Sequence, residues 1–130
     1  MLITSIPQYI QGVTNAKVDL TTTNLTTLFT VPSDADFNAA VVNSILVSED
    51  SGYADTITVT LTDTASAVFS LFKVKAVGAN TTVELLTKDL ILQSGEVLKV
   101  QAATANRLHV VASIQELSKT RVTTSAISRI

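Results

Sequence analysis

The chain offers few residues able to perform covalent or acid–base chemistry, because it has one histidine, His109, and no cysteine. A catalytic triad needs a base beside a hydroxyl or thiol nucleophile. Arg107 stands two residues before His109, so on a strand both side chains share a face and form a cationic pair for an anionic partner. The interpretation we favour is an ordinary histidine at a solvent or interface position. One histidine without cysteine also excludes the usual zinc constellations.

Carboxylates are the remaining candidates for acid–base work or metal binding. They stand at Asp34 and Asp36, at Glu49 and Asp50, and at Asp55, all within predicted turns. Oxygen-rich turns can bind calcium, but this spacing matches no EF-hand pattern, and acidic residues are common in turns. The glycines are isolated, so they build no phosphate-binding loop. We therefore predict no catalytic residue, no metal site and no cofactor.

Aromatic side chains are few: four phenylalanines and two tyrosines, without tryptophan. Sites for sugars and single-stranded nucleic acids stack rings on exposed aromatic residues. We expect the phenylalanines to fill the core and Tyr53, within an Asp/Ser/Gly loop, to be exposed. A receptor- or sugar-binding module is the alternative function that the exposed ring of Tyr53 would have to serve.

The composition is that of a single β-rich domain. The 130 residues are a common length for one domain, and only 15% of them are charged. Threonine and valine are abundant, and β-branched residues suit pleated strands. The net charge of −2 argues against a nucleic-acid partner. No apolar run is long enough for a membrane span, and residues 1–10 lack the features of a signal peptide, so we expect synthesis in a cytoplasm and no membrane partner.

Strict alternation of apolar and polar side chains predicts three strands, at residues 57–62, 98–102 and 108–115. Between the last two, residues 103–106 are short and contain an asparagine, which tolerates positive φ. We therefore predict that these two strands form a hairpin.

Other strands are predicted where β-branched and apolar residues gather between turn-forming breaks. These are residues 25–31, 39–48, 68–77 and 82–85, with an edge strand at 17–22. The spacing of the breaks is typical of antiparallel sandwiches and barrels. We predict an all-β fold, an antiparallel β-sandwich of jelly-roll type with seven or eight strands. A short helical turn at residues 87–92 is a local alternative.

The two ends differ from this middle, and residues 117–130 contain three basic side chains and no acidic one. We expect an N-terminal arm over residues 1–16, a β-sandwich domain over 17–116 and a C-terminal arm over 117–130. The partner-binding residues predicted on the arms are Tyr9, Ile10, Lys119, Arg121, Arg129 and Ile130.

Four segments carry a resemblance to a known group of proteins. They are a strand ending in Val-Pro at residues 25–32 (LTTLFTVP), then 45–48 (ILVS), a threonine-rich strand at 59–63 (VTLTD) and 90–98 (LILQSGEVL). In this order, over residues 22–116, the chain resembles the small virion structural proteins of tailed phages, especially those of marine and cyanobacterial hosts. These motifs are strands and turns rather than a reactive site.

The resemblance implies a capsid decoration (cement) protein, often a homotrimer, that bridges neighbouring subunits of the head shell. Its partners would be the major capsid protein or other virion subunits, and its location the virion after synthesis in the host cytoplasm. The basic C-terminal arm could then pair with an acidic shell surface. A tail, neck, baseplate or fibre component is the alternative within the virion, and an enzyme is the class we favour least.

Overall fold

The computed structural model describes residues 9–33 and 39–118, and every regular element in this part of the chain is a β-strand. The strands are β1 (Tyr9–Asp19), β2 (Thr26–Thr30), β3 (Ala39–Glu49), β4 (Asp55–Thr62), β5 (Val68–Val77), β6 (Thr82–Glu84), β7 (Leu90–Gln93), β8 (Val97–Ala102) and β9 (Leu108–Ser118). Over the described ranges, no helix of the length and apolar character needed to cross a membrane is present.

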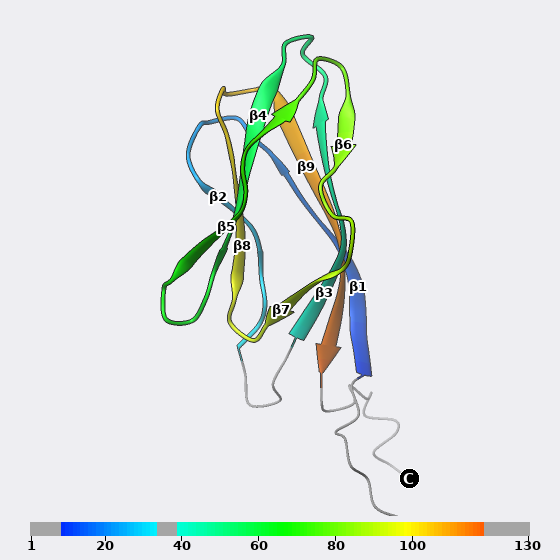
Figure 1. The fold of residues 1–130 in the computed structure, drawn as a ribbon. Helices are drawn as coiled ribbons and strands as arrows, with labels where there is room; N and C mark the ends of the chain where they lie inside the picture. The colour runs from blue at the N-terminus through cyan, green and yellow to red at the C-terminus, as the bar shows by residue number, and fades with distance from the viewer. Residues whose placement is uncertain (1–8, 34–38, 119–130) are drawn as a thin grey trace, which may run out of the picture.

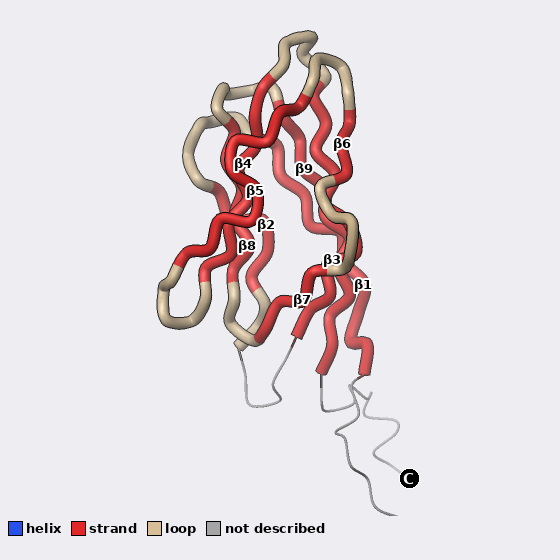
Figure 2. The backbone as a smooth tube through the Cα atoms, in the orientation of Figure 1, coloured by secondary structure: helices blue, strands red, loops and turns tan. Residues whose placement is uncertain are grey.

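The strands form two sheets that face each other, as Figures 1 and 2 show. One sheet has the order β1-β9-β3, and both β6 and β7 pair with the remaining side of β3. The other has the order β2-β8-β4-β5. All pairings are antiparallel. The predicted antiparallel β-sandwich is therefore confirmed.

The strand pairs are nested along the chain, which defines a jelly roll. β4 pairs with β5, β3 with β6 and β7, β2 with β8, and β1 with β9. A jelly roll has eight strand positions in two sheets. The described residues form nine strands, rather than seven or eight, because β6 and β7 share one position beside β3.

The core lies between the sheets and follows the alternation of the strands, with one change of phase in β3. Ala40 and Val42 face inward in the first half of β3, and Ile45 and Val47 in the second. The pairing of β3 with β9 shifts register between Val42 and Ser44, and this bulge turns both halves toward the core. The buried apolar residues of β4, β8 and β9 are Ile57, Val59, Leu98, Val100, Ala102, Leu108, Val110, Ala112 and Ile114.

The hairpin predicted for residues 98–115 is wrong, because β8 and β9 belong to different sheets. Their connection crosses from one sheet to the other. The N–H of Ala103 donates to the carbonyl of Thr56 in β4, whereas the N–H of Asn106 donates to the carbonyl of Leu20, just after β1. Asn106 does adopt positive φ, +65°, as expected for its type.

The predicted edge strand is present but begins earlier, at Tyr9, so residues 9–16 of the expected N-terminal arm belong to β1. The half-buried residues of this part of β1 are small: Gly12, Thr14 and Ala16. Ala16 packs against the core. The helical alternative at residues 87–92 is also wrong, since β7 starts at Leu90. The division into one domain and two arms stays a prediction.

Candidate functional site

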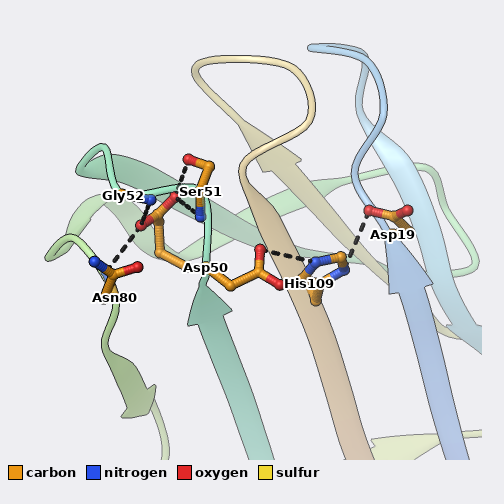
Figure 3. A network of polar contacts seen from close by, with 7 residues as sticks. Asp19, Asp50, Ser51, Gly52, Asn80 and His109 are labelled. Atoms are coloured by element: carbon orange, nitrogen blue, oxygen red, sulfur yellow. Dashed lines mark hydrogen bonds and ion pairs between the residues drawn. The ribbon is translucent and has the colours of Figure 1, made fainter.

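Glu49, the last residue of β3, joins two loops through a buried carboxylate (Figure 3). Its Oε1 accepts the backbone N–H groups of Asn80 at 2.9 Å and Gly52 at 3.2 Å. Its Oε2 accepts the N–H of Ser51 at 2.8 Å and the Ser51 hydroxyl. Burial alone would raise the pKa of Glu49, but the hydrogen bonds from Ser51, Asn80 and Gly52 outweigh it and lower the pKa to about 2. The ionised carboxylate therefore fastens the β3–β4 loop to the β5–β6 loop.

His109 lies beside this loop, between two carboxylates (Figure 3). Its Nδ1 is 3.2 Å from Oδ1 of Asp19 at the end of β1, and its Nε2 is 3.2 Å from Oδ1 of Asp50 just after β3. The register explains the arrangement, because His109 pairs with Asp19 on one side and Ser48 on the other. A catalytic triad needs one ring nitrogen directed at a hydroxyl or thiol. Here both ring nitrogens face carboxylates, so the imidazole links the end of β1 to the residue that follows β3.

Arg107 has other partners than His109. Its guanidinium lies over the Tyr53 ring, 5.0 Å from the centroid, and its Nη1 donates to the carbonyl of Ala54 at 3.0 Å. A cation on an exposed aromatic face is worth about 0.5–1 kcal/mol. Tyr53 is 64% exposed, which confirms the prediction for its loop. Arg107 thus orders the β3–β4 loop, and it does not act with His109 on a shared anion.

The other predicted carboxylates do not assemble into a site in the described ranges. Asp55 is buried, and its Oδ2 accepts the N–H of Thr104 at 3.0 Å, which fastens the β8–β9 connection to β4. Asp34 and Asp36 lie outside the described residues. Within residues 9–33 and 39–118, no three histidine or acidic side chains are placed to hold a metal ion. The described acidic side chains at this end of the sandwich fasten loops and strands.

The predicted arm residues begin where β1 and β9 meet. Tyr9 and Ile10 open β1, opposite Ser118 and Leu117 of β9. The remaining predicted partner-binding residues, Lys119, Arg121, Arg129 and Ile130, lie outside the described part of the chain. The first and last described residues of the β1–β9 pair, Tyr9 and Ser118, therefore lie side by side. The binding role of the predicted arm residues stays a prediction.

Large apolar side chains are exposed on or beside the edge strands of the described sheets. Val13 on β1 is 76% exposed, Phe69 on β5 is 52% exposed and Ile91 on β7 is 64% exposed. Leu25, immediately before β2, is exposed as well. The edges of the two sheets are β1, β2, β5 and the position shared by β6 and β7. Each edge thus has an exposed apolar group on it or beside it.

The exposure of Phe69 corrects the expectation that the phenylalanines fill the core. Phe29 and Phe72 do pack against the core, and Phe37 lies outside the described residues. Phe69 stands near the tip of the β4–β5 hairpin, which projects away from the other sheet in Figure 1. The sequence carried a signal, because residues 68–77 have apolar side chains on both faces, more than one core-facing side can use.

A groove of about 480 Å³ runs between β5 and the segment joining β6 to β7. Leucines and Phe72 line it, with Lys75, Lys88 and Asp89 at its borders. Several of these leucines and Phe72 also pack against the core, so the groove borders the apolar interior.

No protein-family model matches the chain, and no curated protein sequence matches it. Solved structures with a similar chain path include two of a pentameric capsid protein isolated from metagenomic phage sequences. They have TM-scores of 0.46 and 0.45 at 20% identity and cover 82% of this chain, which spans 63% and 60% of theirs. A structure of infectious bursal disease virus, Gt strain, has a TM-score of 0.35 at 12% identity, covering 86% of this chain and 32% of that one. At these identities the likeness concerns the fold alone.

Proposed function

We propose that this chain is a virion structural protein that decorates the capsid and stabilises it by bridging neighbouring capsid subunits. The observation that carries the proposal is the set of exposed apolar side chains on the edge strands β1, β5 and β7, namely Val13, Phe69 and Ile91, together with Leu25 just before β2. Edges that combine unpaired backbone groups with apolar side chains associate with other chains unless they are protected. Only 15% of the residues are charged, so few charges lose water when such surfaces pack.

The resemblance of residues 22–116 to tailed-phage virion proteins supplies the class of partner. Because Tyr9 pairs with Ser118, the two predicted arms are attached at neighbouring points of one sheet. In the proposal both arms contact the adjacent subunit. The basic residues Lys119, Arg121 and Arg129 pair there with acidic groups of the shell.

Occupancy of purified particles tests the proposal. Variants lacking residues 1–8, residues 119–130 or both are compared with the full chain by quantitative mass spectrometry, and electron microscopy locates a labelled full chain. We expect label on the head and occupancy at least about tenfold lower for the double deletion, since the arms supply contacts to a second subunit. Unchanged occupancy after both deletions would contradict the role of the arms. Label on the tail, neck, baseplate or fibre would establish the alternative virion role.

A charge-matched pair of variants separates the arm from general electrostatics. Changing Lys119 and Arg121 to glutamine removes two positive charges from the arm, and changing Lys73 and Lys75 to glutamine removes two from β5. Only the first pair should lower occupancy. Equal losses in both pairs would assign the effect to net charge. The native mass of the purified chain distinguishes the homotrimer that the resemblance implies from other oligomeric states.

The exposed ring of Tyr53 favours a second candidate, a receptor-binding module of the virion. Arg107 covers one face of the ring, which leaves the other for a sugar or an apolar group. Tyr53→Ala should then reduce adsorption to host cells, and Tyr53→Phe should retain it. Normal adsorption of Tyr53→Ala particles would exclude this candidate.

A further inference from the structure

Three of the four sheet edges are poorly suited to receive a further strand. β5 pairs with β4 through two register irregularities, and its exposed Val74 has a φ of +54°, an outlier for a β-branched residue. Lys73 and Lys75 flank this position. Bulges and lysines are the usual protection of an edge against strand addition. The stretch of β5 around Val74 is therefore protected against the addition of a further strand.

Two further edges are short. β2 has five residues, with a register shift between Thr27 and Phe29. β6 and β7 have three and four residues, and they pair with separate parts of β3. Isolated ladders of this length are marginal in water.

β1 is the long and regular edge. It has 11 residues, and from Gly12 to Asp19 it pairs with β9 without a register shift. It pairs with no other strand among the described residues. Its outward side chains along this stretch are exposed: Val13, Asn15, Lys17 and Asp19. They comprise one cation, one anion and two uncharged groups.

We propose that the free edge of β1 pairs with β1 of a second copy of this chain, antiparallel and about a two-fold axis at Asn15. The axis is placed there because the N–H of Leu20 donates to the carbonyl of Leu108, so in this register the odd-numbered residues direct their backbone groups to the free edge, and Asn15 is the one beside the midpoint of the regular stretch from Gly12 to Asp19. Val13 then lies opposite Lys17 of the partner subunit, and the aliphatic stem of that lysine covers the valine. The backbone ladder binds the two strands, as in other cases of strand addition.

Charge favours β1 over β5 as the edge at which a second copy binds. Lys17 and Asp19 cancel along β1, so two copies of this strand meet without net repulsion. The same pairing at β5 would bring Lys73 and Lys75 toward their own copies. A two-fold interface is formed by the same surface on both subunits, so it produces a closed dimer rather than an open chain of subunits. The sheets β1-β9-β3 of the two subunits would become one continuous sheet.

A disulfide tests this contact directly, because the chain has no cysteine of its own. Asn15→Cys places one thiol at the two-fold axis, where Cα atoms of opposed antiparallel residues lie about 4.5–5.5 Å apart, within disulfide range. Ala79→Cys, at an exposed position in the β5–β6 loop, is the matched control. We expect a cross-linked dimer at least about tenfold faster from Asn15→Cys than from Ala79→Cys, because pairing raises the local thiol concentration.

The native mass of the unmodified full chain provides the second measurement. We expect even-numbered species, and a dimer constant weakened about tenfold by Val13→Glu together with Lys17→Glu, which makes β1 acidic. A monomeric or solely trimeric mass, or equal cross-linking of the two cysteine variants, would overturn the proposal. So would a dimer that forms only when residues 119–130 are removed, since that segment would then be the occupant. These measurements use purified protein, so they fail or succeed separately from the location in the virion.

Discussion

Replacing Thr60 by valine should stabilise the fold, because the Thr60 hydroxyl is buried without a partner. Thr60 lies within β4 and is 6% exposed, and among the described residues its Oγ1 is the one buried side-chain polar atom that makes no hydrogen bond. Burying an unsatisfied hydroxyl costs about 1–3 kcal/mol. Valine has the same shape without the hydroxyl. We therefore expect Thr60→Val to raise the free energy of unfolding by about 1 kcal/mol.

Thr58, two residues earlier on the same strand, provides a control of opposite sign. Its Oγ1 accepts the backbone N–H of Val74 at 3.1 Å, at the residue of β5 with a φ of +54°. Thr58→Val leaves that donor without its partner and removes the bond that holds the strained residue. We expect a loss of about 1 kcal/mol. Both variants make the same chemical change in one strand, so differences in strand propensity cancel.

Urea unfolding followed by far-ultraviolet circular dichroism measures both effects. For slopes of about 1–3 kcal/mol per molar urea, each change shifts the midpoint by roughly 0.3–1 M, upward for Thr60→Val and downward for Thr58→Val. The slopes should not change, because neither side chain alters the surface exposed on unfolding. If both midpoints move in the same direction, the hydrogen-bonding difference between the two threonines does not control stability and the reasoning is refuted.

Two further predictions concern the loops. The hydrogen bonds to Glu49 lower its pKa from 4.5 to about 2, so their stabilisation is complete above about pH 4.5 and is lost as the pH falls toward 2. Glu49→Gln should lower stability at neutral pH and flatten its decline between these pH values; urea midpoints across the range check this, and an unchanged acid decline would contradict it. Gly95 has a φ of +81°, and a Cβ there would lie 2.8 Å from Cγ2 of Thr64. Gly95→Ala should therefore cost about 1–3 kcal/mol, whereas Gly12→Ala, with no atom within 4 Å of its added Cβ, should cost less by the same unfolding assay.

The alternation of side chains was enough to predict the core strands and the sandwich. In β8 and β9, and in β4 as far as Val59, a period of two places one apolar set inward and burial follows it, whereas Thr60 of β4 is buried as well. β3 differs, because the bulge between Val42 and Ser44 changes which residues face inward. Which strands pair with one another was harder to predict, because a short connection such as residues 103–107 can either close a hairpin or cross between sheets. The outcome depends on contacts with residues distant in sequence, such as those of Ala103 with Thr56 and of Asn106 with Leu20.

The loop-fastening role of Glu49 could not be predicted, because one of its donors, Asn80, is distant in sequence. His109 and Asp19 likewise meet only through the register of β1 with β9. In contrast, the exposure of Tyr53 followed from its local turn residues. Features that depend on neighbouring residues in the sequence could be predicted, whereas contacts that depend on strand pairing could not.

The nested pairing of the strands has a consequence for the order of folding. The pair β4 and β5 closes a short loop, whereas β1 and β9 join opposite ends of the described chain and close the longest one. Non-local pairs form late because their loop entropy must be overcome first. We therefore expect β1 to dock last, onto a β9 already held by β3. An incomplete chain would not display the finished β1 edge, so assembly through that edge would select subunits that have completed folding.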